Sequence, residues 1–235
     1  MTASSNQDQD VIPPGGVKIC GIREPRHALA AVEAGADMLG FVFAPSRRQV
    51  TAESAMACIE AIRGANVTVV GLFVNAGAET INRAAERLGL DAVQLHGDVS
   101  PDLMRAIDRP VIRAINTSPS ASLSDVHALL PNEHEPSPVA FQIDGFAPGA
   151  RGGTGVLADW SLAAALAPRV PLVLAGGLTS ENVSEAIRRV APRAVDVSSG
   201  VETDGVKDEA KIHQFVEAAK RAFATSFASV VKHDP

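Results

Sequence analysis

One pattern, repeated eight times along most of the chain, limits what this protein can fold into. Each repeat is a short, continuous apolar run followed by a segment whose apolar residues have helical spacing. Continuous apolar runs are typical of parallel strands that are buried on both faces. The eight predicted strands cover residues 17–22, 38–43, 68–74, 92–96, 111–115, 139–143, 171–175 and 194–197.

The segments between these runs carry the start and stop signals of helices. Thr51 and Ser100 are suited to cap the helices that follow them, and Pro101 suits the first helical position. Gly35 and Gly89 follow helical segments, where glycine readily adopts a left-handed cap. The predicted helices cover residues 25–34, 52–63, 78–88, a segment from 101, 122–130, 159–167, a helix capped by Ser180 and ending at Arg189, and 208–224.

Eight such alternations predict an α/β protein, a single (β/α)₈ TIM barrel with a parallel eight-stranded sheet. Periodicity alone leaves a doubly wound open sheet as the alternative. The catalytic domain is predicted over residues 17–226. Residues 1–16, polar and then Pro-Pro-Gly-Gly, are predicted to be a disordered leader, and residues 227–235 a C-terminal tail.

Composition excludes several classes of partner and environment. A net charge of −6 gives no electrostatic footprint for nucleic acid. Two cysteines do not form a disulfide framework, and no signal peptide or membrane-spanning run is recognisable, so we expect a cytoplasmic protein with no membrane partner. Monomer is the default expectation, because oligomeric state is not readable from the sequence.

Two small-residue runs follow the predicted seventh and eighth strands. They are Leu174-Ala-Gly-Gly-Leu178 and Val195-Asp-Val-Ser-Ser-Gly200. Each offers backbone N–H groups to an anion, and in a TIM barrel the loops after these two strands commonly form a phosphate site. We therefore expect a phosphorylated ligand.

Polar residues just past the other strand ends should share the same rim. Cys20 and Asp144 form a candidate base and acid pair, although a buried structural thiol and a loop-fixing carboxylate are the alternatives. Strand parity puts Lys18 on the same side as Cys20, whereas Cys58 is expected in the core. Arg47 or Arg48 suits a substrate carboxylate. The remaining rim candidates are Asn75, His96 and Arg113.

Two segments depart from the repeat. Residues 116–138 carry four prolines and are expected to make a surface excursion, whereas the Gly-rich residues 145–155 suit a mobile lid. His96 has no second ligand at metal-binding spacing, and no strand–turn–helix carries Gly-x-Gly-x-x-Gly, so we expect neither a metal nor a redox cofactor. A metal-dependent pentose phosphate epimerase and a catalytically silent phosphate-binding barrel are the competing interpretations.

Several motifs, in register from about residue 17 to 216, resemble those of the N-(5'-phosphoribosyl)anthranilate isomerase family. They are Val17-Lys-Ile-Cys-Gly-Ile22, Gly35-Ala-Asp37 with Leu39-Gly-Phe-Val-Phe43, Gln94-Leu-His-Gly97, Gly152-Gly-Thr-Gly155 with Asp159-Trp160, Leu174-Ala-Gly-Gly-Leu178 with Glu181-Asn-Val183, and Val195-Asp-Val-Ser-Ser-Gly-Val-Glu202 with Lys207-Asp208.

The resemblance implies an Amadori rearrangement of phosphoribosylanthranilate to 1-(2-carboxyphenylamino)-1-deoxyribulose 5-phosphate, the third step from chorismate to tryptophan. It implies Cys20 as general base, Asp144 as general acid and Arg48 as the ligand of the anthranilate carboxylate, with no cofactor. The implied phosphate ligands are Gly176, Gly177, Ser199 and Gly200. Four further residues are expected as substrate contacts or parts of the lid, namely His96, Gly152, Gly153 and Asp196.

Overall fold

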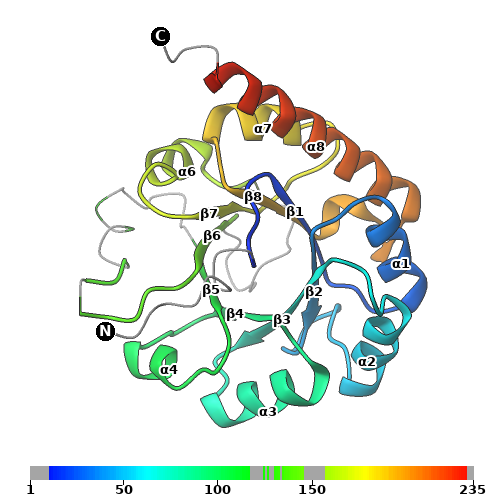
Figure 1. Cartoon of the computed structure of the whole chain (residues 1–235), viewed down its shortest axis with the longest axis vertical. Helices are drawn as coiled ribbons and strands as arrows, with labels where there is room; N and C mark the ends of the chain where they lie inside the picture. Colours follow the sequence, from blue (N-terminus) through cyan, green and yellow to red (C-terminus); the bar gives the residue numbers. More distant parts are fainter. Residues whose placement is uncertain are drawn as a thin grey trace.

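The computed structural model describes residues 11–116, 124, 126, 130–132, 134–145 and 157–231. Eight parallel strands close into a barrel in the order β1 to β8, each pairing with its neighbours in the chain (Figure 1). This confirms the predicted TIM barrel and excludes the open sheet. The strands are β1 (Gly16–Cys20), β2 (Met38–Val42), β3 (Thr68–Val74), β4 (Ala92–His96), β5 (Val111–Asn116), β6 (Ala140–Asp144), β7 (Leu172–Leu174) and β8 (Ala194–Val197).

Helices form a ring outside the strands (Figure 1). After β8 the chain makes a short 3₁₀ turn, η1 (Ser199–Val201), and a two-stranded antiparallel hairpin of β9 (Glu202–Thr203) and β10 (Val206–Lys207). The helices are α1 (Pro25–Glu33), α2 (Ala52–Ala61), α3 (Ala78–Leu88), α4 (Pro101–Arg105), α6 (Trp160–Leu166), α7 (Val183–Val190) and α8 (Glu209–Val231).

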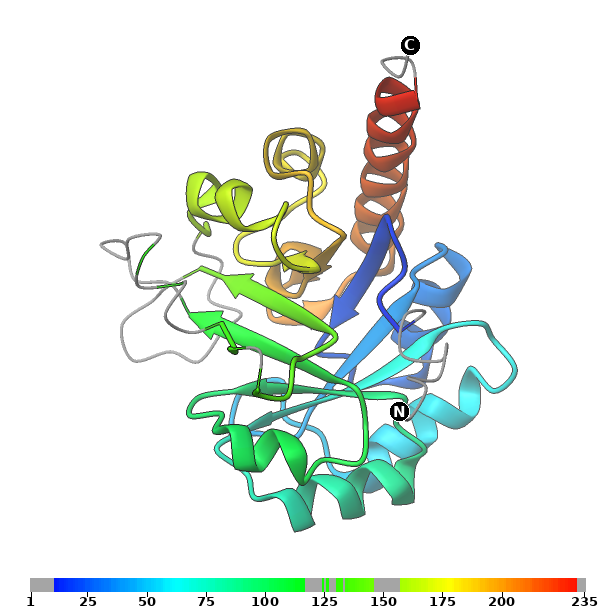
Figure 2. The same cartoon turned by 60° about the vertical axis from the view of Figure 1, so that its left-hand side comes forward.

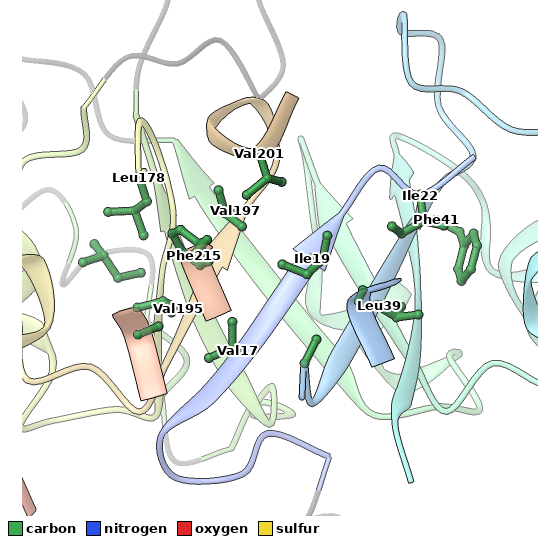
Figure 3. Packing of buried hydrophobic residues seen from close by; sticks show 14 of the residues in the cluster. Val17, Ile19, Ile22, Leu39, Phe41, Leu178, Val195, Val197, Val201 and Phe215 are labelled. Atoms are coloured by element: carbon green, nitrogen blue, oxygen red, sulfur yellow. The ribbon is translucent and has the colours of Figure 1, made fainter. Parts of the chain in front are cut away.

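The main hydrophobic core lies between the strands and the helices. Val17 and Ile19 of β1 and Val195 and Val197 of β8 point outward, and Phe215 of α8 packs with them (Figure 3). All five side chains are buried. Alternate residues therefore face the helices, and the residues between them face the inside of the barrel.

The inside of the barrel is closed at the base by a second, smaller apolar cluster. Ile12 is only 2% exposed and packs with inward-facing side chains that include Met38 of β2 and Ile112 of β5. Its carbonyl oxygen accepts a hydrogen bond of 2.5 Å from Nε of Arg193. The prediction assigned residue 12 to the leader; the structure corrects this boundary, because an apolar side chain is needed to fill the base.

A polar layer lies above this cluster. Lys18 of β1, Gln94 of β4, Gln142 of β6 and Asp196 of β8 are all buried. Lys18 and Asp196 are register partners on adjacent strands, and Nζ of Lys18 lies 3.1 Å from Oδ1 of Asp196. A buried charge of this kind is retained at low cost only when it is paired.

Three predicted helix ends are wrong by two or more residues. Helix α2 ends at Ala61 and not at residue 63. Helix α7 begins after Asn182 and not after Ser180, because the Asn182 side chain accepts from the Thr179 N–H and donates to the Gly177 carbonyl, which keeps this turn outside the helix. Helix α8 continues to Val231, beyond the predicted end at 224 and the domain end at 226, and extends past the rest of the molecule (Figure 2). No helix in the described part of the chain is long and apolar enough to cross a membrane.

Candidate active site

A pocket opens at the carboxyl ends of the strands, on the side opposite the Ile12 cluster. Its hollow measures about 720 Å³, including the part that is open to solvent. Six strands and the segments that directly follow them contribute polar groups or glycines that the sequence singled out. These residues are Cys20, Arg48, His96, Asp144, Gly176, Gly177, Asp196 and Ser199.

Cys20 is the last residue of β1, and its thiol faces this pocket next to Lys18. Burial raises the pKa of the Cys20 thiol, whereas the charge of Lys18 and its hydrogen bond to the sulfur act to lower it. Burial alone would lower the pKa of Lys18, but Asp196 and Cys20 raise it above its usual value. Lys18 is therefore a cation, and it favours the thiolate form of its neighbour.

Gly40 of β2 has no side chain, and the space this leaves is where the Cys20 thiol and the Lys18 ammonium group come together. It is the register partner of Cys20. A Cβ atom at this position would lie 2.8 Å from Sγ of Cys20 and 3.0 Å from Nζ of Lys18, closer than side chains tolerate. The pairing of these two groups therefore depends on glycine in the neighbouring strand.

Asp144 ends β6 and is buried at the pocket wall. Its Oδ1 atom accepts a hydrogen bond of 2.8 Å from the N–H of Gly145. Gly176 comes so close to this turn that an added Cβ would lie 2.3 Å from the Gly145 nitrogen and 3.1 Å from Oδ1. The carboxyl group is thus next to the first glycine of the loop after β7.

Arg48 reaches the pocket from the loop after β2. Its Nε and Nη2 atoms donate to the two carboxylate oxygens of Glu202, at 2.6 and 2.9 Å. The aliphatic stem packs against Gly21, where an added Cβ would be 2.6 Å from Cδ of Arg48. Both contacts fix where the guanidinium lies.

The hairpin β9–β10 supplies a second buried cation beside Glu202. Nζ of Lys207 donates to Oε1 of Glu202 at 2.9 Å and to the carbonyl of Ser198 at 2.8 Å. The Ser198 hydroxyl in turn donates to the Cys20 carbonyl at 2.9 Å. Burial alone would raise the pKa of Glu202, but Arg48 and Lys207 lower it to about 2, whereas burial lowers the pKa of Lys207 to about 8.

His96 ends β4 deep in the pocket, beside two buried amides. The amide nitrogen of Gln94 lies 2.7 Å from Nε2 of His96. Burial, together with the charge of Lys18, lowers the pKa of His96 to about 4, so the imidazole is neutral near pH 7. Nδ1 of His96 and the Oε1 atoms of Gln94 and Gln142 have no hydrogen-bond partner among the described residues.

The loops after β7 and β8 form one edge of the opening. Gly176 and Gly177 have φ values of 83° and 64°, in the left-handed region that favours glycine. Ser199, at the start of η1, lines the pocket beside them. Gly200 does not line it; an added Cβ there would lie 1.9 Å from the Leu178 carbonyl, so this glycine lets the two loops pack together.

The opposite wall is apolar. Val42, Ala44, Leu72 and Val74, from β2, β3 and the loop between them, line the pocket near Cys20. The site therefore has one surface suited to an aromatic ring, and Arg48 lies at the edge of that surface.

Other rim candidates lie outside the pocket. Arg47 is exposed and contacts Glu202 from outside, at 3.2 Å. The Asn75 side chain accepts from the Asp98 N–H at 3.1 Å and fixes a loop. Arg113 points outward instead, because it occupies an outward position of β5, and it lines a separate hollow with Glu135. Cys58 is fully buried in the core, as predicted.

Some predicted features lie outside the described residues. They are Gly152 and Gly153, nearly all of the predicted lid at 145–155, and most of the predicted excursion at 116–138 with its helix at 122–130.

Sequence reasoning assigned no role to Gln94, Gln142, Glu202 and Lys207, although all but Gln142 lie in the motifs that resemble the family. Inward strand parity could have identified the two glutamines, because a polar residue between apolar neighbours on a buried strand faces the inside of a barrel. Glu202 and Lys207 gave no such signal, since their burial depends on contacts with residues far away in the chain. Among the described residues, no three His, Cys, Asp or Glu side chains are grouped to hold a metal ion.

Comparison with known proteins gives a consistent result. Residues 17–218 match the family model described as N-(5'phosphoribosyl)anthranilate (PRA) isomerase. A relative of that name from Roseiflexus castenholzii is 50% identical over 214 residues, which cover 88% of this chain and 98% of the relative.

Two solved structures are similar in fold and sequence. Monomers derived from a dimeric phosphoribosylanthranilate isomerase of Thermotoga maritima match with a TM-score of 0.74 and 39% identity, over 88% of this chain and 98% of the other. A phosphoribosylanthranilate isomerase in complex with reduced 1-(o-carboxyphenylamino)-1-deoxyribulose 5-phosphate matches with a TM-score of 0.74 and 40% identity, over the same shares.

Proposed function

The chain belongs to the N-(5'-phosphoribosyl)anthranilate isomerase family, and from this membership we propose how its pocket performs the family's reaction. The enzyme converts N-(5-phosphoribosyl)anthranilate into 1-(2-carboxyphenylamino)-1-deoxyribulose 5-phosphate by an Amadori rearrangement. One observation carries the assignment of roles: Cys20, Asp144, Arg48 and the glycines after β7 line a single pocket.

In the proposed binding mode, the two ends of the substrate are held by different parts of the rim. The phosphate lies at the loops that contain Gly176, Gly177 and Ser199, which offer backbone N–H groups. The aromatic ring lies against the apolar wall, and its carboxylate contacts Arg48. The ribose then lies between Cys20 and Asp144, near polar atoms of His96, Gln94 and Gln142 that have no partner in the described part of the chain.

Asp144 acts as the general acid in the first step. Protonated, it donates its proton to the ribose ring oxygen while the bond from this oxygen to C1' breaks. The anthranilate nitrogen supplies its lone pair to C1', which gives a protonated Schiff base and leaves Asp144 as a carboxylate. The substrate's own nitrogen is the electron sink, so the step needs no further electron acceptor.

Cys20 acts as the general base in the second step. As a thiolate it removes the proton from C2', whose acidity the adjacent cation has raised. The C–H electron pair forms the C1'–C2' double bond, and the nitrogen becomes neutral again. The resulting enolamine tautomerises to the ketone at C2'. Lys18 supports this role, because its charge favours the thiolate.

A direct assay tests the proposal. Turnover is followed by the loss of phosphoribosylanthranilate fluorescence, with and without a chelator. We expect Cys20→Ala and Asp144→Ala each to lower kcat by at least about 100-fold, as general acid–base catalysis contributes, while binding of the reduced product analogue is retained. The buried Cys58→Ala variant is the matched control. Turnover near that of the wild type in either variant would remove the assigned role.

Two other outcomes would favour the competing functions. Absence of turnover with phosphoribosylanthranilate, together with chelator-sensitive epimerisation of a pentose phosphate, would favour a metal-dependent phosphosugar epimerase. Binding without turnover in the wild-type protein would favour a silent phosphate-binding barrel.

The assembly and location are part of the proposal. We expect a cytoplasmic monomer, with a homodimer as the alternative because one similar structure derives from a dimeric enzyme. Light scattering behind size-exclusion chromatography distinguishes the two states.

A further inference from the structure

The hairpin β9–β10 presses a buried carboxylate against the arginine of the pocket. The side chain of Glu202 is 5% exposed and that of Arg48 is 8% exposed. Two parallel hydrogen bonds, of 2.6 and 2.9 Å, join them. A bidentate contact fixes the plane of a guanidinium as well as its position, which a single hydrogen bond does not do.

Lys207 changes the charge balance of this contact. Its side chain is 2% exposed, and its Nζ lies 2.9 Å from Oε1 of Glu202. Two buried cations therefore share one carboxylate, which leaves a net positive charge at the pocket edge. Glu202 thus holds Arg48 without cancelling the attraction of this edge for an anionic ligand.

The same arrangement reduces the cost of binding. A long side chain that is free in the unliganded protein loses rotamer entropy when a ligand orders it. Here the stem of Arg48 is confined by Gly21 and its head by Glu202 before any ligand binds. A guanidinium held in this way is preorganised for a second planar anion.

We propose that Glu202 is a positioning residue for substrate binding: it fixes the guanidinium of Arg48 in the orientation that receives the substrate carboxylate, with Lys207 as its counter-charge. This inference rests on the proposed function, in which Arg48 binds that carboxylate. Glu202 itself does not touch the substrate, so it should affect recognition of the carboxylate and leave the chemical steps unchanged.

The test compares two probes by isothermal titration calorimetry. One is reduced 1-(o-carboxyphenylamino)-1-deoxyribulose 5-phosphate, and the other is its phenylamino counterpart without the carboxyl group. We expect Glu202→Gln to weaken binding of the carboxylated probe about three- to tenfold, the effect of ordering one long side chain, and to leave the other probe unaffected. In steady-state kinetics KM should rise and kcat should stay.

A second variant addresses folding, because removing one partner of a buried ion pair leaves the other uncompensated. Glu202→Met combined with Lys207→Met removes both charges and keeps the volume. This double variant should show the same selective loss of affinity for the carboxylated probe. Its thermal unfolding midpoint, measured in parallel, shows whether it is folded. Equal weakening of both probes in both variants would mean that Glu202 only maintains structure, and it would overturn the inference.

Arg48→Ala separates this inference from the proposed function. If Arg48→Ala does not discriminate between the probes, Arg48 does not bind the carboxylate, and both the role of Arg48 and this inference fail. If Arg48→Ala discriminates and Glu202→Gln does not, only this inference fails. Adding Glu202→Gln to Arg48→Ala should have no further effect, and the exposed Glu60→Gln serves as the matched control.

Discussion

Lys18 places a positive charge directly beneath the proposed catalytic thiol. The Lys18 side chain points from β1 into the inside of the barrel. There its ammonium group pairs with the Asp196 carboxylate and contacts the Cys20 thiol. Because burial raises the pKa of Cys20 and Lys18 opposes that effect, the activity of the enzyme should depend on pH through this pair.

The prediction at this scale concerns Lys18→Met. An ammonium group favours the thiolate, so its removal raises the pKa of Cys20, and the rising limb of kcat/KM against pH should move upward by about one to three pH units. The control is Lys220→Met, which removes a half-buried ammonium that contacts Asp37 at the other end of the barrel, and it should leave this limb unmoved.

A second variant checks the electrostatic cause. Lys18→Met leaves Asp196 buried without its partner, and Asp196 itself raises the pKa of Cys20. Adding Asp196→Asn should therefore bring the limb part of the way back and recover thermal stability. A limb that stays in place in Lys18→Met would show that the thiol does not depend on this charge.

Single residues also mark the limit of what the sequence predicts. Cys20, Asp144 and the pair of Arg47 and Arg48 were singled out because strand ends in a barrel meet at one rim, which is a property of the repeat; the choice of Arg48 came from the family resemblance. Ile12 was missed because two adjacent apolar residues, Val11 and Ile12, followed by two prolines carry no periodicity. Glu202 was missed because its partner Arg48 is 154 positions away, and no local pattern records such a contact.

At the scale of elements, two equivalent aspartates connect neighbouring strands at the base of the barrel. Oδ2 of Asp37, just before β2, accepts from the Val17 N–H of β1 at 2.7 Å. Oδ2 of Asp91, just before β4, accepts from the Val69 N–H of β3 at the same distance. Each aspartate accepts a hydrogen bond from the backbone of the neighbouring strand, at the end of the barrel away from the pocket.

Asp91→Ala should therefore lower stability without changing catalysis. Loss of a hydrogen bond to a charged acceptor corresponds to about 1.5–3 kcal/mol in the free energy of unfolding, and the base of a TIM barrel contributes to stability and not to chemistry. Urea unfolding and kcat/KM measure the two effects. The control Glu60→Ala, an exposed helical residue, should change the free energy of unfolding by less than about 0.5 kcal/mol.

The accuracy of each predicted helix or strand boundary depends on how clearly the sequence marks it. Strands β3, β4 and β8 and helix α3 match their predicted ranges. Glycines or charged residues adjoin β4, β8 and α3 on at least one side, and polar Asn75 follows β3. Helix α7 starts later than predicted, since Ser180 has the composition of a cap while Asn182 makes the hydrogen bonds that fix the turn. Composition alone does not show whether Ser180 or Asn182 precedes the first residue of the helix.

At the scale of the whole molecule, the barrel separates stability from chemistry along its axis. Apolar side chains fill the base around Ile12, a layer with paired charges and amides lies above them, and the pocket lies at the top. This order predicts that substitutions at the base affect unfolding and leave the pocket intact.

Ile12→Ala tests that separation. Removing a buried isoleucine side chain should cost about 2–5 kcal/mol in the free energy of unfolding, with kcat/KM unchanged at a temperature where the variant is folded. Urea denaturation gives the first quantity and the fluorescence assay the second. Leu29→Ala, at a 41% exposed position on α1, is the control, and a fall in kcat/KM with Ile12→Ala would contradict the separation.

The two cysteine side chains lie in different parts of the barrel, one at the pocket and one in the hydrophobic core. Cys20 faces the pocket next to Lys18, whereas Cys58 of α2 is buried in the core and does not line the pocket; burial raises the pKa of both thiols, that of Cys58 to about 11. A small alkylating reagent should therefore label the native protein at one sulfur, and bound product analogue should protect it. The extent of labelling at Cys20 would then give the fraction of molecules in a preparation whose pocket is intact, so this thiol can be used for active-site titration.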